Sequence, residues 1–352
     1  MRKIIKITFI NVIILIIFLL ILEFLLRHYS NINNINFTND NKSSNLYRVY
    51  EEGKIFKTFE NFYTYKKNIK KRYVYYYKNN QELIKIWDYK FSTNNFGLVQ
   101  KFDLDLNKKS ILFLGDSFTE GQGAEPWIDN FGKSIYGHQI VNGGFGGAGP
   151  KQFIYLNDYL SKKLNIQKRV ILFISSDIRR GIVQLDNTAC IIDHKKCSKE
   201  NIAYGIPSNK DFNIEDFLSK FVFDQKLSKK KKIKFIIRDL YIYNFLRTVI
   251  NSVRLKNDKT INKNLQALSY LNSKYKDHII FIKIKDANDI MFKKDSYESK
   301  LIENYFKINN IKKFNCDMNN DITLFHDHDF HPNKKGYSVL RSCVKKILDK
   351  EL

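Results

Sequence analysis

From Lys109 onward, short apolar runs alternate with amphipathic stretches, and this alternation restricts the fold more than any other feature of the chain. Such a pattern is typical of a parallel sheet flanked by helices. The predicted strands are Ser110–Leu114, Gln139–Val141, Arg169–Ile174 and His278–Ile284, and the predicted helices are Trp127–Tyr136, Gln152–Leu164 and Asn262–Tyr275. Residues 180–255 are too many for a simple crossover, so we expect a helical insertion there. Residues 109–352 should therefore form one α/β domain.

The run Ile7–Leu26 consists of Ile, Leu, Phe and Val apart from three polar residues. A helix of about 20 such residues is long enough to span a bilayer core. No small-x-small cleavage signal follows the run, so we predict that residues 1–29 are a cytoplasmic tip and an uncleaved transmembrane signal anchor. Arg2, Lys3 and Lys6 precede the run and favour a cytoplasmic N-terminus, with the remainder of the chain exported.

Two segments separate this predicted anchor from the α/β domain. Residues 30–46 are dominated by Asn, Ser and Asp and suit a linker. Residues 47–108 are aromatic and basic, and the alternating runs Arg72–Tyr77 and Glu82–Trp87 predict a hairpin in a β-rich lead-in segment. Its tyrosines either pack in a core or stack on carbohydrate, and packing is favoured because tyrosine is common in strands.

The amino-acid composition argues against several classes of protein. With 43% hydrophobic and 27% charged residues the chain is not disordered as a whole. Its net charge of +24 raises nucleic acid as a partner, but Lys, Asn, Ile and Tyr are enriched throughout and no recognition motif accompanies the charge, so we expect no nucleic-acid binding. Four cysteines exclude a disulfide-built scaffold, although Cys190 and Cys197 either pair outside the cytoplasm or remain free thiols.

Two short motifs carry candidate chemistry. Ser117 directly follows a predicted buried strand, in a glycine-bearing turn, where open α/β sheets place their active sites. A serine hydroxyl needs a base to become nucleophilic. Near the C-terminus, His331 follows the carboxylate Asp329 by two residues. We therefore predict Ser117 as nucleophile, His331 as general base and then acid, and Asp329 as the group that orients the imidazole.

These motifs, in this order, resemble the conserved blocks of the SGNH (GDSL-like) hydrolase family. Gly115-Asp116-Ser117 matches the first block, and the Gly-rich segment Val141–Gly147 matches the second, best at Gly147 with Gly146 as the neighbouring possibility. The last block is matched by Asp329, His331, Pro332, Asn333 and Gly336. Residues 94–97 resemble the lead-in of membrane-anchored members, and the resemblance extends over most of the chain that follows.

The resemblance implies a flavodoxin-like, three-layer α/β/α fold with a parallel sheet. It also implies an acyl-serine intermediate, no cofactor or metal, and an oxyanion hole that includes the backbone N–H groups of Ser117 and Gly147. For a membrane-anchored bacterial member, we expect a single-pass protein of the inner membrane with its catalytic domain on the periplasmic or extracellular side.

The chain departs from the family pattern at two places. The third block has Gly-x-Asn-Asp in the family, whereas this chain has Ile174-Ser175-Ser176-Asp177, so Ser176 stands where an asparagine donor would complete the oxyanion hole. Losing one such donor typically costs about 10²- to 10³-fold in rate. The last block reads Asp-x-His rather than Asp-x-x-His, which leaves Asp327 as a reserve candidate for the third triad member.

The function that we favour from the sequence is a membrane-anchored serine esterase or acyl transferase. It would act on O-acyl groups, O-acetyl above all, of cell-envelope glycans or on another ester substrate. A metal-dependent hydrolase is an alternative, because His326, Asp327, His328, Asp329 and His331 concentrate ligands that Asp116 and Asp177 could supplement. A catalytically weak or inactive glycan-binding or assembly protein is another, given Ser176. The oligomeric state does not follow from the sequence.

Overall fold

A computed structural model describes residues 2–33, 46–50, 55–78, 82–185, 258–291 and 295–352, together with single positions between 216 and 246. The chain divides into two compact units, Met1–Asn45 with Glu215–Asn257 and Leu46–Ile214 with Asp258–Leu352. The lead-in segment and the α/β domain thus belong to one unit. Most of the predicted insertion at 180–255 lies outside the described residues, as do most of the predicted linker and both Cys190 and Cys197.

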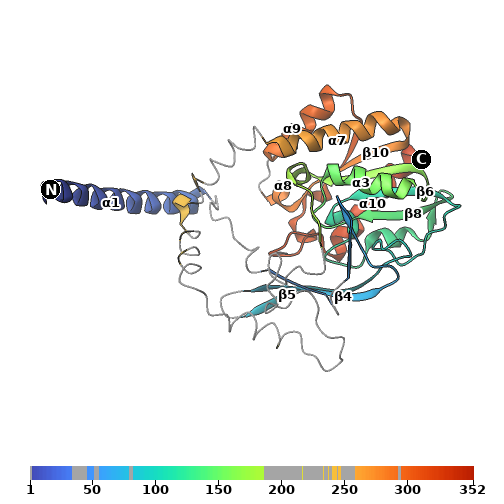
Figure 1. Cartoon of the computed structure of the whole chain (residues 1–352), viewed down its shortest axis with the longest axis horizontal. Coiled ribbons are helices and arrows are strands. Elements are labelled where there is room, and N and C mark those ends of the chain that lie inside the picture. The colour runs from blue at the N-terminus through green and yellow to red at the C-terminus, as the bar shows by residue number, and fades with distance from the viewer. Residues whose placement is uncertain are drawn as a thin grey trace. The chain divides into compact units, whose positions relative to one another are not determined.

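The first unit contains helix α1, Arg2–Asn33 (Figure 1). Its segment Ile10–Tyr29 has a mean hydropathy of 2.7 and none of it is buried. That length and composition fit a membrane-spanning helix, and they fit an N-terminal signal sequence equally well.

A six-stranded sheet forms the centre of the second unit, with the order β11-β10-β9-β6-β8-β7. The strands are β6 (Lys109–Gly115), β7 (Ser134–Ile135), β8 (His138–Gly144), β9 (Asn165–Ile174), β10 (Ile279–Ile284) and β11 (Lys313–Cys316). All neighbours pair in parallel except β7 with β8. Taken in chain order, the parallel strands are arranged 2-1-3-4-5, which is the flavodoxin-like order. The strands that follow β6 in the chain are therefore added first on one side of it, as β8, and then on the other, as β9. The strand order reverses between β6 and β9, although these two strands are parallel.

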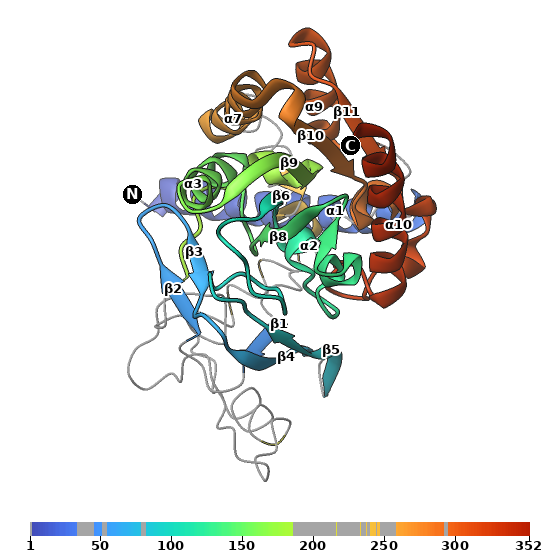
Figure 2. The same cartoon turned by 90° about the vertical axis from the view of Figure 1, so that its right-hand side faces the viewer.

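Helices cover both faces of this sheet, which confirms the three-layer α/β/α architecture (Figure 2). On one face, Arg169 donates to Asn157 of α3 (Pro150–Ser161), and Phe173 and Phe281 contact Phe306 of α9 (Tyr297–Ile308). Helix α7 (Lys259–Tyr275) packs beside α3.

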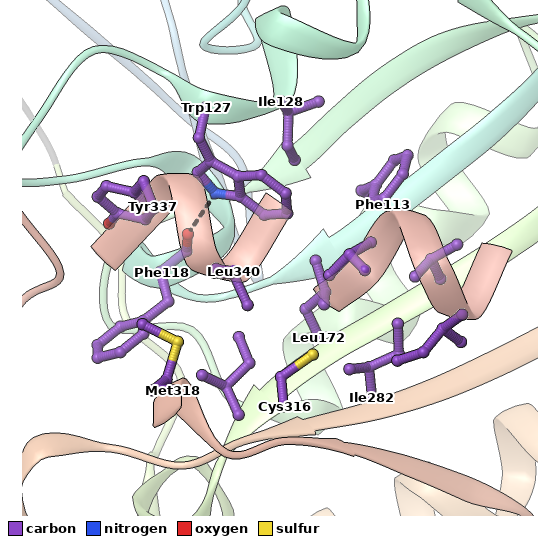
Figure 3. Packing of buried hydrophobic residues seen from close by; sticks show 14 of the residues in the cluster. Phe113, Phe118, Trp127, Ile128, Leu172, Ile282, Cys316, Met318, Tyr337 and Leu340 are labelled. Atoms are coloured by element: carbon purple, nitrogen blue, oxygen red, sulfur yellow. Dashed lines mark hydrogen bonds between the residues drawn. The ribbon is translucent and has the colours of Figure 1, made fainter. Parts of the chain in front are cut away.

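The other face of the sheet packs against α10 (Lys334–Glu351). The alternate side chains of β6, β9 and β10 form a buried cluster with Leu340, Val344 and Tyr337 of this helix (Figure 3). Cys316, at the end of β11, forms a disulfide with Cys343 of α10. The helix that follows His331 in the chain is thus fixed to the sheet by apolar packing and by a covalent bond.

The predicted helix Trp127–Tyr136 is wrong. A 3-10 helix, η2, spans Trp127–Phe131 and is followed by β7, which pairs antiparallel with β8. The helix stops because Gly132 has a φ of +84°, and Tyr136 and Gly137, at φ values of +48° and +74°, form the turn into β8. Trp127 and Ile128 are buried in the core, but they lie in a short 3-10 helix rather than in a regular α-helix.

The lead-in segment forms two small antiparallel sheets, β1-β4-β5 and β2-β3. The strands are β1 (Leu46–Tyr50), β2 (Phe56–Thr58), β3 (Tyr63–Tyr65), β4 (Lys70–Lys78) and β5 (Leu83–Ser92). The pairing of β4 with β5 confirms the predicted hairpin. Most tyrosines of the segment are buried, and their rings contact one another, as Tyr50 and Tyr73 do with centroids 4.3 Å apart. Packing is therefore their main role.

Candidate active site

Ser117 lies at the carboxyl end of β6, beside the point where the strand order reverses. It begins the short helix α2 (Ser117–Glu120), and Asp116 caps this helix by accepting a hydrogen bond from the Phe118 amide at 2.9 Å. A Cβ at position 115 would lie 2.4 Å from the carbonyl oxygen of Leu172, so only glycine lets β6 and β9 approach this closely. The turn thus holds the Ser117 side chain at the edge of the sheet, 5% exposed.

His331 reaches Ser117 from the loop between β11 and α10. Its Nε2 lies 2.8 Å from the Ser117 hydroxyl, and its Nδ1 contacts a carboxylate oxygen of Asp329. With Nδ1 donating to that carboxylate, Nε2 is left to accept the serine proton. Asn333 caps α10 by accepting from the amides of Lys335 and Gly336, which fixes the helix that follows the histidine. The structure thus brings Ser117, His331 and Asp329 into one chain of hydrogen bonds.

The lead-in segment surrounds the carboxylate end of this chain. The Trp87 ring packs edge-on against His331 at 5.5 Å, and Tyr75 lies within hydrogen-bonding reach of Asp329. Burial raises the pKa of Tyr75 to about 12, so its hydroxyl stays protonated. For Asp329, burial acts to raise the pKa, but His331 and Arg48 outweigh it and the pKa lies below the usual range. Asp329 therefore carries its negative charge.

Asp327, the reserve candidate, is exposed, and its backbone carbonyl accepts from the Asp329 amide at 2.9 Å. The other two histidines of this loop, His326 and His328, have partners outside the Ser117–His331–Asp329 series. His326 Nε2 contacts the Gly123 carbonyl oxygen at 2.6 Å, and His328 stacks on Tyr77 at 4.1 Å. Within the described ranges, no group of three His, Cys, Asp or Glu side chains is arranged to hold a metal ion. The residues proposed for the metal alternative therefore do not converge.

The third block follows β9 as a 3-10 helix, η3 (Ser175–Arg179). Ser176 is half-buried at its start and lines the cavity described below. Asp177 accepts from the Ile174 amide at 3.1 Å and forms an ion pair with Arg180 at 2.8 Å. The same guanidinium nitrogen lies 2.8 Å from Asp116. Arg180, which the sequence analysis did not single out, thus connects the first block to the third.

Gly146 and Gly147 both border the same space as Ser117. The Gly146 carbonyl accepts from the Tyr63 hydroxyl at 2.9 Å, and the Gly146 N–H lies near the Glu120 carboxylate and acts to lower its pKa. Gly147 has a φ of +76°, a conformation that side-chain-bearing residues rarely adopt. Because the Gly146 N–H lies near the Glu120 carboxylate, Gly147 is the better candidate for an oxyanion donor.

A cavity of about 400 Å³ opens beside Ser117. Its lining combines the predicted site residues Ser117, Gly147, Ser176, Asp329 and His331 with side chains that the sequence did not predict, among them Arg48, Tyr50 and Tyr63 of the lead-in segment. The only sequence signal for the latter group was the density of aromatic residues in that segment. The site is therefore built from both parts of the second unit.

Comparisons with known proteins identify relatives by structure only. No family model matches the sequence, and no curated protein is significantly similar to it. Among solved structures, the chain is similar to a lipase/acylhydrolase from Enterococcus faecalis, with 12% identity, a TM-score of 0.35 and coverage of 69% of this chain and 97% of the other.

Two further structures are similar at the same level. A GDSL-like lipase from Bacteroides thetaiotaomicron has 15% identity and a TM-score of 0.35, with coverage of 71% of this chain and 93% of the other. A variant of an acetyl xylan esterase from Geobacillus stearothermophilus has 12% identity and a TM-score of 0.31, with coverage of 69% and 95%. Likenesses this distant concern the fold alone, so the chemistry of this chain has to follow from its own residues.

The two nearby carboxylates provide the first prediction. Replacing Asp329 by Ala should lower the turnover of an activated acetyl ester by about 10³-fold or more, because His331 loses the group that holds its tautomer. Replacing Asp327 by Ala should change turnover by less than about twofold, because surface side chains away from a site contribute little. The measurement is steady-state hydrolysis by the two purified variants. A greater loss in Asp327→Ala would reassign the third triad member.

Proposed function

We propose that this chain is a serine esterase or acyl transferase that works through an acyl-serine intermediate. The observation that supports this most directly is the hydrogen-bonded series Ser117, His331 and Asp329 at the carboxyl edge of the sheet. A serine or a histidine alone at such a position would be weak support for catalysis. Their contact across more than 200 residues of sequence, beside a cavity, fits a nucleophile and its base.

In the first half of the reaction, His331 Nε2 accepts the proton of the Ser117 hydroxyl as the oxygen attacks the ester carbonyl carbon. The tetrahedral intermediate then collapses, the bond to the alcohol oxygen breaks, and His331 returns its proton to the departing alcohol. In the second half, water or a sugar hydroxyl attacks the acyl-serine and loses a proton to His331. This intermediate collapses as the bond to the Ser117 oxygen breaks, and His331 returns the proton to Ser117. Ionised Asp329 stabilises the imidazolium that forms in both halves.

The oxyanion of each intermediate needs donors on the opposite side of the carbonyl carbon. We assign this role to the backbone N–H groups of Ser117 and Gly147 and to the Ser176 hydroxyl, all of which border the cavity. A serine hydroxyl reaches less far than an asparagine amide. The backbone donors should therefore carry most of the stabilisation.

For the substrate, we propose O-acyl groups, above all O-acetyl, on cell-envelope glycans. The cavity of about 400 Å³ suits a small acyl group with part of its alcohol. Tyr50, Tyr63 and Phe330 supply aromatic rings in its wall, and Arg180 and Asn288 add polar groups. This combination of apolar rings and polar groups is suited to a sugar.

We propose further that α1 anchors the chain in the bacterial inner membrane and that the second unit lies on the outer side. The apolar segment Ile10–Tyr29 is long enough to span a bilayer. The disulfide between Cys316 and Cys343 supports the outer location, because disulfides persist in oxidising compartments.

The acyl-serine mechanism is tested by labelling the detergent-solubilised full chain with a fluorophosphonate probe. The wild-type protein should be labelled at Ser117 and should hydrolyse an activated acetyl ester. Ser117→Ala should lose both properties while keeping its melting temperature, because the hydroxyl contributes little packing. Addition of O-acetylated and unacetylated glycans separates hydrolysis from transfer. Unchanged turnover in Ser117→Ala would exclude the mechanism, and absence of labelling in the wild-type protein would favour a glycan-binding protein.

Ser176 provides a prediction of gained activity. Ser176→Asn should raise kcat or leave it level and should change KM less, because the amide reaches toward charge that develops only in the transition state. The matched control is Ser176→Ala, which should lower kcat. The measurement is the pair of steady-state constants for one activated acetyl ester. If neither substitution changes kcat, Ser176 does not contribute to the oxyanion hole.

The location is tested with epitope tags in bacterial spheroplasts. A tag after Leu352 should be removed by external protease, whereas a tag before Met1 should be protected until the membrane is broken. The full-length chain should also stay in the membrane fraction at high salt, because salt screens surface charge but does not extract a spanning helix. Cleavage of the N-terminal tag alone would reverse the proposed orientation, and release by salt would contradict the anchor.

A further inference from the structure

The backbone of Gly146 lies between two side chains that the reaction itself does not use. The Tyr63 hydroxyl, from strand β3, donates to the Gly146 carbonyl oxygen at 2.9 Å. The Gly146 N–H lies near the carboxylate of Glu120, at the end of α2, and acts to lower the pKa of that carboxyl group. The Gly146 carbonyl belongs to the same peptide group as the Gly147 N–H, so Tyr63 holds the peptide that carries the proposed donor, and Glu120 lies beside the preceding peptide.

Glu120 is itself fixed within the protein. Its carboxylate accepts from the Tyr65 hydroxyl at 2.6 Å and from the Gln122 side-chain amide at 3.0 Å. The side chain is almost fully buried, and burial raises its pKa to about 7. Burying a carboxyl group is costly unless its oxygens are hydrogen-bonded, as they are here. These hydrogen bonds hold the Glu120 carboxyl group in one position at the end of α2.

The backbone around this contact leaves little space for movement. A Cβ at Gly144 would lie 2.2 Å from the Glu120 amide nitrogen, and the Phe145 amide donates to the Gly115 carbonyl at 3.2 Å. On the outer side, the Tyr63 ring packs edge-on against Phe145 at 5.3 Å. The segment 144–146 is thus enclosed between the first block and the β2–β3 hairpin.

We infer that Tyr63 and Glu120 are positioning residues for the oxyanion hole. By holding Gly146 at its carbonyl oxygen and beside its N–H, they direct the Gly147 amide, which shares a peptide group with the Gly146 carbonyl, into the cavity beside Ser117. This inference rests on the proposed function, because Gly147 acts as a donor only if an acyl-serine forms. It assigns to the lead-in segment a part in the reaction that its sequence, rich in packing tyrosines, did not indicate.

Tyr63→Phe is the sharpest test because it removes one hydroxyl and keeps the ring contacts with Phe56 and Phe145. The matched control is Tyr76→Phe, which removes a hydroxyl from a buried tyrosine of β4 that is outside the set of cavity-lining residues. Glu120→Gln tests the N–H side of Gly146 with a side chain of the same size. Each variant is made in the full chain and compared with the wild-type protein and with Ser117→Ala.

Two measurements are made on each variant, namely amide hydrogen exchange of peptides covering 142–149 and the steady-state constants for an activated acetyl ester. In Tyr63→Phe, exchange should be faster and kcat should fall about tenfold with KM within about twofold, because a misdirected donor affects only the transition state. Glu120→Gln should shift both measurements in the same direction. The double variant should be little worse than the poorer single variant, since both changes act through the position of one residue, Gly146. Tyr76→Phe should leave both measurements unchanged.

Unchanged exchange or unchanged kcat in Tyr63→Phe would overturn the inference, as would an equal loss in Tyr76→Phe. Failure of the proposed function looks different, because Ser117→Ala would then keep its turnover or the wild-type protein would have none. In that case the exchange data still decide whether Tyr63 and Glu120 hold the loop, while their role in an oxyanion hole is excluded.

Discussion

The ion pairs of Arg180 with Asp116 and Asp177 hold together the part of the fold on which the site depends. Both carboxylates are fully buried, and each lies 2.8 Å from the same guanidinium nitrogen. Burial raises the pKa of Asp177 well above its usual range, and Arg180 opposes that shift. Two buried carboxyl groups without this cation would repel one another or have to take up a proton. Asp116 caps the helix that begins with Ser117, and Asp177 binds the backbone at the end of β9, so one side chain sets the distance between the nucleophile and the third block.

The local patterns of the sequence were sufficient for the four central strands of the sheet, β10, β9, β6 and β8, because each contains a run of apolar residues that can be recognised without its neighbours. The same patterns gave wrong or missing elements where the conformation depends on backbone turns or on residues far away in the chain. β11 was not predicted because Lys313–Cys316 is short and half polar, and the helix expected over Trp127–Tyr136 is interrupted by glycine conformations that a count of apolar residues does not register. The order of motifs predicted that Ser117, Asp329 and His331 meet. Arg180 and Glu120 were not predicted, because their value depends on partners that are far away in the chain, such as Asp116 and Tyr65.

The lead-in segment shows why packing and function were hard to separate from the sequence. Its tyrosines were predicted to pack, and they do, but packing brings several of them to the site. Trp87 contacts His331, Tyr75 lies within reach of Asp329, and Tyr63 contacts the loop before Gly147. A buried ring carries its hydroxyl to a fixed position, and a buried hydroxyl requires a partner. The same residue can therefore stabilise the segment and orient the site. Packing in a core and a functional role do not exclude one another for these residues.

In the family pattern that the sequence resembles, an asparagine occupies the position of Ser176, and this difference bears on the proposed oxyanion hole. A side-chain donor with full reach would tolerate some movement of the backbone amides, because it shares the developing charge with them. A shorter donor leaves more of that charge to the amides of Ser117 and Gly147, and preorganised dipoles stabilise charge only when they need no reorganisation as the charge develops. Holding Gly146 between Tyr63 and Glu120 is the kind of rigidity that such a site requires. If the chain is an active esterase, the enclosure of its oxyanion loop and the shorter side chain of Ser176 are two parts of one physical solution.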